Sequence, residues 1–262
     1  MSCPEATGAA EATAALEDAT RRLRAVLDAP EAAETRPAGA GPAGADARRA
    51  SLDEELCDRL IDLAAARAWA ADRATARDPA AGVLRGCALW AVATDTARVL
   101  AMTGTDRPAR GATVAAHGRV ADLVTALAGA EVYDGVRDRL RTALGPRPAG
   151  RAAAAWEIAE SALSGLGTTR DEWVGADPAH TAAGGWVLVD RVGRLALGAA
   201  LLSAAPAYPA EQAETCVNAA RRYTWNHLRQ PPPEAATAVH VRRTADLVDW
   251  IAGSAPVERS RA

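Results

Sequence analysis

Apolar residues recur at helical spacing along almost the whole chain, and glycine and proline break the pattern into segments. The segment after Asp78-Pro79 is typical, because proline at the first helical position precedes apolar residues that continue to Leu100. No window keeps the strict alternation of apolar and polar residues that marks a half-buried β-strand. We therefore predict an all-α fold.

The breaks also predict where the helices begin and end. Two Ser/Thr-x-x-Glu words, Ser51 to Glu54 and Thr169 to Glu172, are typical of capping boxes at helix N-termini. Residues 30–49 are rich in Ala, Gly and Pro, and we predict that they form a flexible linker. The predicted helices are 9–29, 51–69, 79–104, 110–129, 131–144, 152–167, one from Pro178 through Leu195, one that follows Pro209 and ends before Pro231, and 234–253.

An internal repeat suggests how these helices are grouped. Residues 119–129 (RVADLVTALAG) match residues 243–253 (RTADLVDWIAG) at seven of eleven positions. Upstream, residues 60–62 (LID) pair with residues 188–190 (LVD) at nearly the same offset. We therefore predict two pseudo-repeated four-helix bundles, joined by a connecting helix and loop. The predicted domains are an N-terminal bundle at 1–129, the connection at 130–151 and a C-terminal bundle at 152–255.

Composition and charge exclude several classes of protein. The formal net charge of -3 argues against a nucleic-acid partner, since such proteins usually carry a basic excess. No stretch approaches the roughly 20 apolar residues of a membrane helix, and the first residues lack the pattern of a signal peptide. The four cysteines stand far apart without a C-x-x-C pair, and the four histidines show no metal-ligand spacing. We expect a cytoplasmic protein with no metal site and no membrane partner.

The tryptophans and cysteines have a simple structural interpretation. Alanine accounts for 69 residues and phenylalanine is absent, so the seven tryptophans are the largest side chains for filling a core. We predict that they pack in the core and do not form ligand platforms. Cys57, Cys87 and Cys216 lie on apolar helix faces and are predicted to be buried.

Four short segments follow one another along the chain: 169–175 (TRDEWVG), 188–191 (LVDR), 223–227 (YTWNH) and 242–243 (RR). In this order they resemble the C-terminal helical domain of the acyl-CoA dehydrogenase superfamily. The corresponding motifs of the family are R-x-Q-F-G, L-A-D-M, G-F-T-W-E-H and an Arg-Arg pair. The first word carries one extra residue and has lost its Gln-Phe pair. Residues 59–80 also look similar to the second bundle helix of the family.

The resemblance implies a fold like that C-terminal domain and assigns roles to four residues. It places Arg170, Gly175 and Trp225 at cofactor-binding positions, with FAD as the cofactor and an acyl-CoA as the substrate. It places Asn226 where the family has its catalytic carboxylate, and an amide cannot accept the substrate proton. The chain has no strand-rich segment that would supply the other wall of the flavin site, so we do not expect it to hold FAD alone.

The resemblance therefore implies a divergent, non-catalytic helical subunit that forms homo- or hetero-oligomers through its bundles. A full-length acyl-CoA dehydrogenase is the implied partner. One alternative is an active FAD-dependent subunit that completes its site with a partner. Another is a HEPN-like helical ribonuclease, because Arg222-x4-His227 and Arg110-x6-His117 fit the loose R-x(4–6)-H pattern of that class.

Overall fold

The computed structural model describes residues 78–102, 120–174, 184–207 and 210–229, and the single positions 18, 21, 58, 61, 62, 65, 66 and 181. Every regular element within this part is helical, which confirms the predicted all-α class. Its α-helices are α3 (Pro79–Met102), α5 (Val120–Ala128), α6 (Ala130–Leu144), α7 (Ala153–Ser164), α8 (Leu166–Asp171), α10 (Trp186–Ala204) and α11 (Ala210–His227). Two short 3-10 helices, η2 (Gly150–Ala152) and η3 (Ala205–Ala207), precede α7 and α11. Of the predicted helix 9–29 only Asp18 and Arg21 are described, and both are helical, whereas the linker 30–49 and the predicted helix 234–253 lie outside the described residues.

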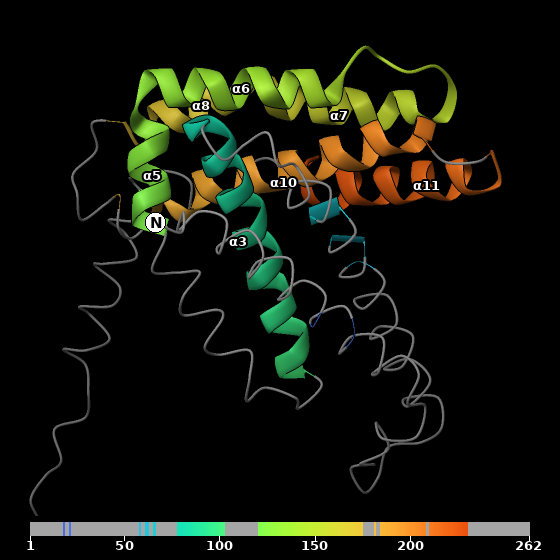
Figure 1. Ribbon diagram of the computed structural model, residues 1–262, viewed down its shortest axis with the longest axis horizontal. Helices are drawn as coiled ribbons and strands as arrows, with labels where there is room; N and C mark the ends of the chain where they lie inside the picture. The colour runs from blue at the N-terminus through green and yellow to red at the C-terminus, as the bar shows by residue number, and fades with distance from the viewer. Residues whose placement is uncertain are drawn as a thin grey trace, which may run out of the picture.

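Two helical hairpins form the body of the structure. Figure 1 shows α6 and α7 running antiparallel along one edge, with α10 and α11 antiparallel beside them. Each of these helices packs on its neighbours in the other hairpin: α6 on α10, α7 on both α10 and α11. Helix α3 crosses the layer and packs on α10 and α6, while α5 closes one end against α3, α6 and α10.

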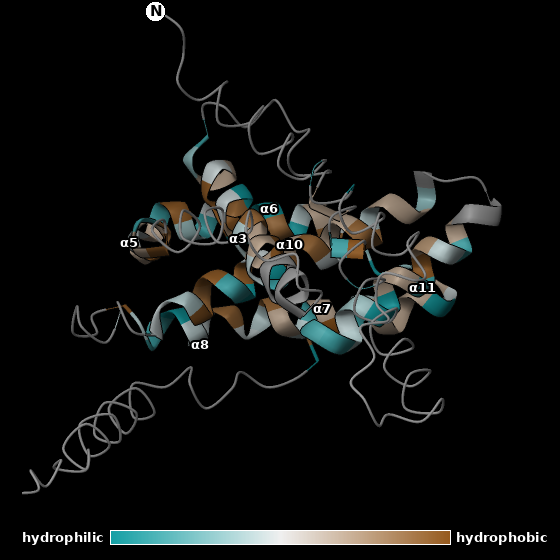
Figure 2. Cartoon of the chain, turned by 90° about the horizontal axis from the view of Figure 1, so that it is seen from below, coloured by the Kyte–Doolittle hydropathy of each residue, from teal (hydrophilic) through white to brown (hydrophobic). Residues whose placement is uncertain are grey.

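Helix α10 lies at the centre of this arrangement. It packs against α3, α5, α6, α7, α8 and α11, and 13 of its 19 residues are buried. A helix that is apolar on every side is stable only when other elements surround it. In Figure 2 the apolar stretches of α3, α6 and α10 meet in the middle of the molecule. The core is therefore built around α10.

Small residues let α3 and α10 approach each other closely. A Cβ atom added to Gly193 of α10 would lie 2.3 Å from the carbonyl oxygen of Cys87 and 3.1 Å from the Cβ of Ala91. Cys87 is fully buried, as predicted, whereas Cys216 on α11 is only half-buried. The backbones of the two central helices thus meet at a glycine that no larger residue can replace without displacing one of them.

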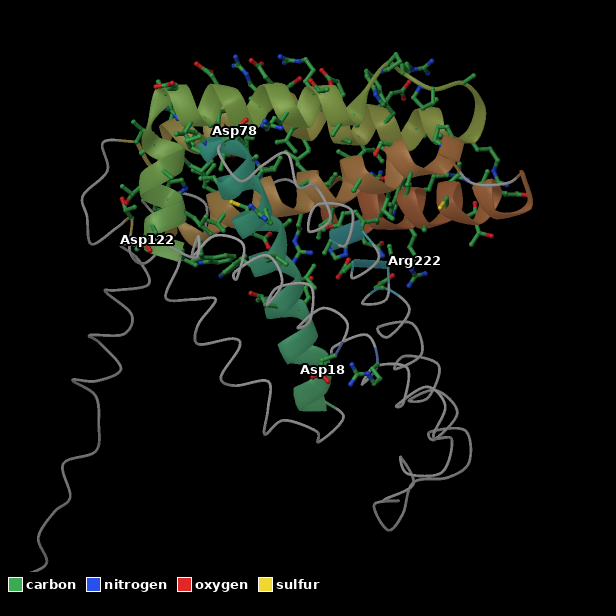
Figure 3. All side chains as sticks on the ribbon, viewed as in Figure 1. Asp18, Asp78, Asp122 and Arg222 are labelled. Atoms are coloured by element: carbon green, nitrogen blue, oxygen red, sulfur yellow. The ribbon has the colours of Figure 1, made fainter. Side chains whose placement is uncertain are left out.

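The predicted start of α3 is confirmed. Oδ1 of Asp78 accepts hydrogen bonds from the backbone N–H groups of Ala80 (2.9 Å) and Ala81 (3.3 Å), as an N-cap residue does. Its other carboxylate oxygen pairs with Arg139 of α6, and Figure 3 shows Asp78 at the α6 end of α3. One aspartate therefore caps α3 and ties it to α6.

The end of α6 also agrees with the sequence. The helix ends at Leu144, and Gly145 has a φ of 62°, a conformation that glycine adopts without the strain a Cβ would cause. The N–H of Gly145 donates to the carbonyl of Arg141, and its carbonyl accepts a hydrogen bond (3.1 Å) from the indole Nε1 of Trp156. This contact fixes the turn between α6 and α7.

The predicted capping box at Thr169 is wrong. Thr169 lies inside α8, which already begins at Leu166, after a break at Gly165 that separates it from α7. The Thr169 hydroxyl donates to the carbonyl of Gly165 at 3.4 Å and accepts a hydrogen bond from Arg191 of α10. The Thr169 hydroxyl thus makes a tertiary contact with α10 and does not cap a helix. The local sequence does not reveal this contact.

Helices from both predicted bundles contribute to one contiguous core. This core contains buried side chains of α3 and α5 together with those of α7, α10 and α11. The predicted connecting helix, α6, adds Tyr133, Val136, Leu140 and Leu144 to the same core. Within 119–129, Val124 and Leu127 are buried and Leu123 is half-buried. The duplication itself stays a prediction because its second copy, 243–253, lies outside the described residues.

Within the described part of the chain, no helix combines the length and the apolar character that a membrane crossing requires.

We expect Gly193→Ala to lower the free energy of unfolding by roughly 1–3 kcal/mol or more, because the added methyl group meets backbone atoms that cannot rotate away. Gly82→Ala is the matched control, since Gly82 is an exposed residue of α3 with nothing within 4 Å of an added Cβ. There the exchange should stabilise the protein by about 0.5–1 kcal/mol. Urea unfolding followed by circular dichroism measures both. Equal effects of the two exchanges would contradict the close approach of α3 and α10.

Asp78 should make stability depend on pH. The hydrogen bond from Arg139 is the main cause that holds the pKa of Asp78 below its usual value. A lowered folded-state pKa gives stability that is present above the unfolded pKa and is lost as the pH falls through the folded pKa. Asp78→Asn keeps a capping oxygen but loses the charge, so its deficit against the wild type should be largest near neutral pH and should shrink below about pH 4. Asp78→Ala also loses the cap, at a further cost of about 1 kcal/mol. A deficit of Asp78→Asn that does not change with pH would exclude the ion pair.

Candidate functional site

Arg170, which the resemblance places at a cofactor-binding position, is engaged within the fold. Its Nε donates to the carbonyl oxygen of Leu127 (3.1 Å) and its Nη2 to that of Ala128 (2.6 Å). These are the last carbonyls of α5, which lack partners inside the helix. The guanidinium also lies over the Tyr133 ring, 4.7 Å from its centre, and Nη1 lies 3.5 Å from Asp171.

These contacts occupy Arg170 as a helix cap. Only 16% of its side chain is exposed, and every nitrogen of its guanidinium has a protein partner. To contact a phosphate, Arg170 would have to release the end of α5. Gly175, the second residue of that cofactor-binding word, lies outside the described residues.

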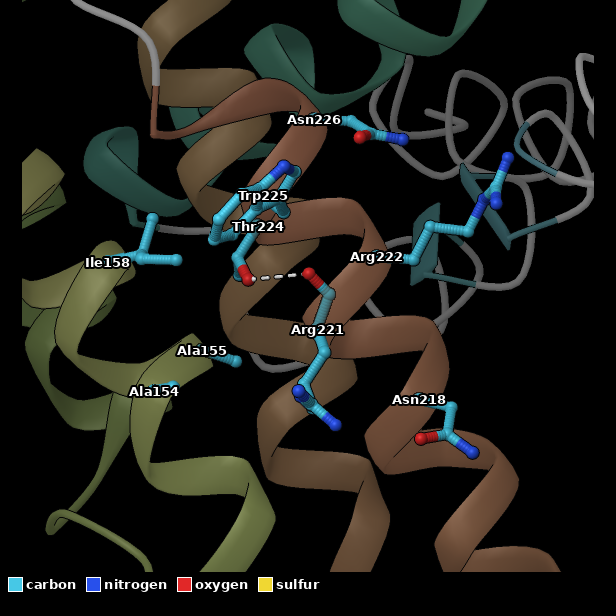
Figure 4. Close-up of a pocket in the computed structure, with 9 residues that line it drawn as sticks. All are labelled: Ala154, Ala155, Ile158, Asn218, Arg221, Arg222, Thr224, Trp225 and Asn226. Atoms are coloured by element: carbon cyan, nitrogen blue, oxygen red, sulfur yellow. Dashed lines mark hydrogen bonds between the residues drawn. The ribbon is translucent and has the colours of Figure 1, made fainter.

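Trp225 and Asn226, the other two predicted site residues, come together on the last turns of α11. Both line a cavity of about 430 Å³ between α7 and α11. Figure 4 shows Ile158 of α7 beside Trp225 on one side of this cavity, while Asn226 projects from the other side of α11. We call this cavity the α7–α11 groove, and it is lined by Ala154, Ala155, Ile158, Asn218, Arg221, Arg222, Thr224, Trp225 and Asn226.

The groove is apolar on one side and cationic on the other. The α7 side contributes two alanines and Ile158, while α11 contributes Arg221 and Arg222, and none of the nine lining residues is acidic. Arg222 forms an ion pair with Asp58, whereas Arg221 is exposed and has no ion pair with any described residue. The carboxylates on the nearby exposed surface are already paired: Glu157 with Arg147, and Glu214 with Arg151, each at 2.6 Å. The groove therefore has a positive charge in a chain whose net charge is negative.

The prediction that tryptophans are core residues is right for some positions and wrong for Trp225 and for Trp186, which is 37% exposed. Trp90 and Trp173 are 4% and 3% exposed, but Trp225 is 55% exposed. The Arg229 guanidinium stacks over the Trp225 ring, 3.5 Å from its centre, and covers one face of the indole. Tryptophan is among the residue types enriched at the energetic centres of protein–protein interfaces.

Asn226 is an exposed lining residue whose side chain projects from the side of α11 that faces away from Ile158, and the resemblance places it at the position of the catalytic carboxylate. Its amide can donate and accept hydrogen bonds but cannot take a proton from carbon. No carboxylate among the lining residues replaces it. The groove, as the described residues form it, is equipped for binding and has no general base.

A polar cluster surrounds Arg194 of α10, whose side chain is 14% exposed. Its Nε donates to both carboxylate oxygens of Asp190, at 2.9 and 3.1 Å, and its Nη1 donates to Asp95 of α3 at 2.9 Å. Nη1 also lies 2.8 Å from Nδ1 of His227 on α11. Because arginine only donates, this contact is a hydrogen bond in the tautomer in which Nδ1 accepts.

The pKa shifts in this cluster follow from burial and charge. Burial raises the pKa of Asp190, although the charge of Arg194 opposes it. Burial acts to lower the pKa of Arg194, but the negative charges of Asp190 and Asp95 outweigh it, and the pKa is raised. Burial, reinforced by the charge of Asp62, raises the pKa of Tyr223 well above its usual value. All described carboxylates of the cluster thus favour a positive Arg194 at neutral pH.

The sequence carries a signal for this cluster that no short motif captures. Helix α10 is apolar along almost its whole length, yet it contains Asp190 and Arg194 one turn apart. Charges in a helix that is otherwise apolar predict an ion pair inside the core. The two LID/LVD words of the repeat end in Asp62 and Asp190, and the charges of both act on the same buried residue, Tyr223.

The two residues of the ribonuclease-like word do not act together in the described structure. Arg222 and His227 lie five positions apart on α11, which places them on different faces of the helix. Arg222 pairs with Asp58, while His227 contacts Arg194 and lies 4.6 Å from the Tyr223 ring. Arg110 and His117 lie outside the described residues.

The described residues bring no three His, Cys, Asp or Glu side chains together as a group that could hold a metal ion. Burial raises the pKa of the Cys87 thiol far above its usual value, so this cysteine is a core residue without thiolate chemistry. No protein-family model, no curated protein and no solved structure matches the chain.

We expect Arg194→Met to lower the free energy of unfolding by about 3–5 kcal/mol, because it removes the guanidinium that Asp95 and Asp190 both bind in a cluster that is mostly shielded from solvent. Arg147→Met is the matched control: it breaks an ion pair whose side chains are both 56% exposed, and should cost less than about 1 kcal/mol. The deficit of Arg194→Met should shrink as the pH falls, since a protonated aspartate is less costly to bury. Chemical unfolding at neutral and acidic pH tests this. Similar costs for both arginines would show that the cluster is not buried.

Proposed function

We propose that this protein is a non-catalytic helical subunit that binds a partner protein through the outer faces of its helices. The resemblance to the acyl-CoA dehydrogenase superfamily suggests a full-length enzyme of that class as the partner. The observation that carries the proposal is the position of Arg170, whose guanidinium caps α5. The residue at the cofactor position thus has a structural role.

The groove supports the same proposal. At the position of the catalytic base, Asn226 supplies an amide, and beside it Trp225 offers an exposed aromatic surface. Exposed tryptophan and arginine are the residue types that contribute most to protein–protein interfaces. Asn226 and Trp225 can therefore bind a partner, but neither can accept a proton from a substrate.

Arg170 and Trp225, the two described residues at the family's cofactor positions, do not fit a flavin in this arrangement. Arg170 is held by two backbone carbonyls and the Tyr133 ring. Arg229 covers one face of the Trp225 indole. No reaction step through a flavin is therefore assigned to this chain.

Replacing Arg170 distinguishes a role as the cap of α5 from a role in cofactor binding. If it caps α5, Arg170→Ala should lower the free energy of unfolding by about 1–3 kcal/mol, because two carbonyls lose a charged donor. Arg170→Lys should recover only part of this, since lysine cannot bridge both oxygens with a planar fork. Arg141→Ala is the control, an exposed arginine of α6 that should cost less than about 1 kcal/mol.

The visible absorbance of the purified protein completes the test. We expect no stoichiometric flavin band, and we expect co-expression with a full-length acyl-CoA dehydrogenase to yield a complex on size-exclusion chromatography. A stoichiometric flavin band that is lost in Arg170→Ala, with stability unchanged, would overturn the proposal and favour the active, partner-completed enzyme.

A further inference from the structure

The α7–α11 groove has the arrangement of a docking site for another helix. It runs between two helices that lie side by side, α7 and α11 (Figure 4). Its lining residues on α11 recur at helical spacing, from Asn218 through Arg221 and Arg222 to Trp225. Helices pack by placing the side-chain ridge of one into a groove of this kind. An open groove with an apolar side also suits an amphipathic helix from a partner.

The charge of the groove indicates which charge the partner helix carries. Arg221 and Arg222 line it, and no acidic side chain does. Arg222 is balanced by Asp58, but Arg221 has no ion pair with any described residue and is exposed. An acidic partner would supply the missing counter-charge, whereas a basic partner would be repelled.

The same charges argue against a second copy of this chain docking face to face. A twofold contact through the groove would bring Arg221 of one copy close to Arg221 of the other. No lining residue supplies a carboxylate to offset this repulsion. The occupant must therefore bring its own acidic side chains.

We propose that the α7–α11 groove binds an amphipathic helix of a partner protein, with its apolar face against Ile158 and Trp225 and an acidic flank against Arg221. This proposal rests on the proposed function and names the chemistry of the partner. The apolar face covers Ala154 and Ile158 of α7 and the open face of the Trp225 indole. The acidic flank pairs with Arg221 on the side of the groove where α11 presents its polar residues.

A displayed peptide library tests this without knowledge of the natural partner. The library consists of helices of about five turns, or about 18 residues, with leucine on one face and Glu, Gln or Lys varied at the flanking positions. Selection on the wild-type protein should enrich clones with glutamate flanks. Each enriched clone is then synthesised, and its affinity is measured by calorimetry against the wild type and the variants.

Three variants and one control assign the binding to the groove. Arg221→Glu should weaken the acidic peptide by about tenfold or more, and Trp225→Ala should weaken it to a similar extent. Ala154→Trp fills the groove from an exposed position and should abolish binding. Arg141→Glu makes the same change of net charge on exposed α6, away from the lining residues, and should leave the affinity within about twofold.

Several outcomes would overturn the inference. These are enrichment of lysine-flanked clones, the absence of any clone that is sensitive to Ala154→Trp, or an equal effect of Arg141→Glu and Arg221→Glu. Binding of a single-stranded oligothymidine that depends on Trp225 would instead identify a stacking platform for nucleic acid. A flavin bound to the purified protein would overturn the proposed function, whereas the library result bears on the groove alone, so the two failures are distinguishable.

Discussion

Helix α10 can occupy the centre of this protein because the charges it carries are neutralised inside the core. Arg194 bonds to Asp190 on its own helix, to Asp95 on α3 and to His227 on α11. An unpaired charge at such a position would cost several kcal/mol, and well-formed hydrogen bonds are what make a buried ion pair tolerable. Gly193, the adjacent residue, lets the α3 backbone come close enough for Asp95 to reach the guanidinium. Close packing and charge pairing are therefore two parts of one contact.

The same use of polar groups is repeated at the ends of the helices. Asp78 caps α3 and pairs with α6, Trp156 closes the turn after α6, and Arg170 caps α5. Each of these side chains satisfies backbone groups that would otherwise lack partners. A residue engaged in this way is not free to bind a ligand. For this reason Arg170 contributes to the fold, and the α7–α11 groove, where Arg221 and Trp225 remain exposed, is the surface that we assign to binding.

The structure separates the sequence signals that are local from those that are not. Asp78-Pro79 and Gly145 mark helix ends through contacts within a few residues, and both predictions are confirmed. The capping box at Thr169 has an equally good local pattern, yet the hydroxyl bonds to Gly165 and Arg191 because α8 has already begun. The candidate site shows the same limit: the sequence selected Trp225 and Asn226 together, but it could not distinguish a buried tryptophan from an exposed one.

The helical character of the described chain and several of its helix ends are encoded locally, because helical periodicity and capping act over four residues or fewer. The sequence also holds the trace of a buried ion pair, as two charges one turn apart in the apolar α10. The partners that complete this pair depend on the tertiary structure, since Asp95 and Arg194 are 99 residues apart and meet through the packing of α3 on α10. The tertiary structure likewise makes Arg170 a helix cap and leaves Trp225 facing solvent. These outcomes depend on which helices lie side by side. That arrangement is determined by the burial of apolar surface across the whole core.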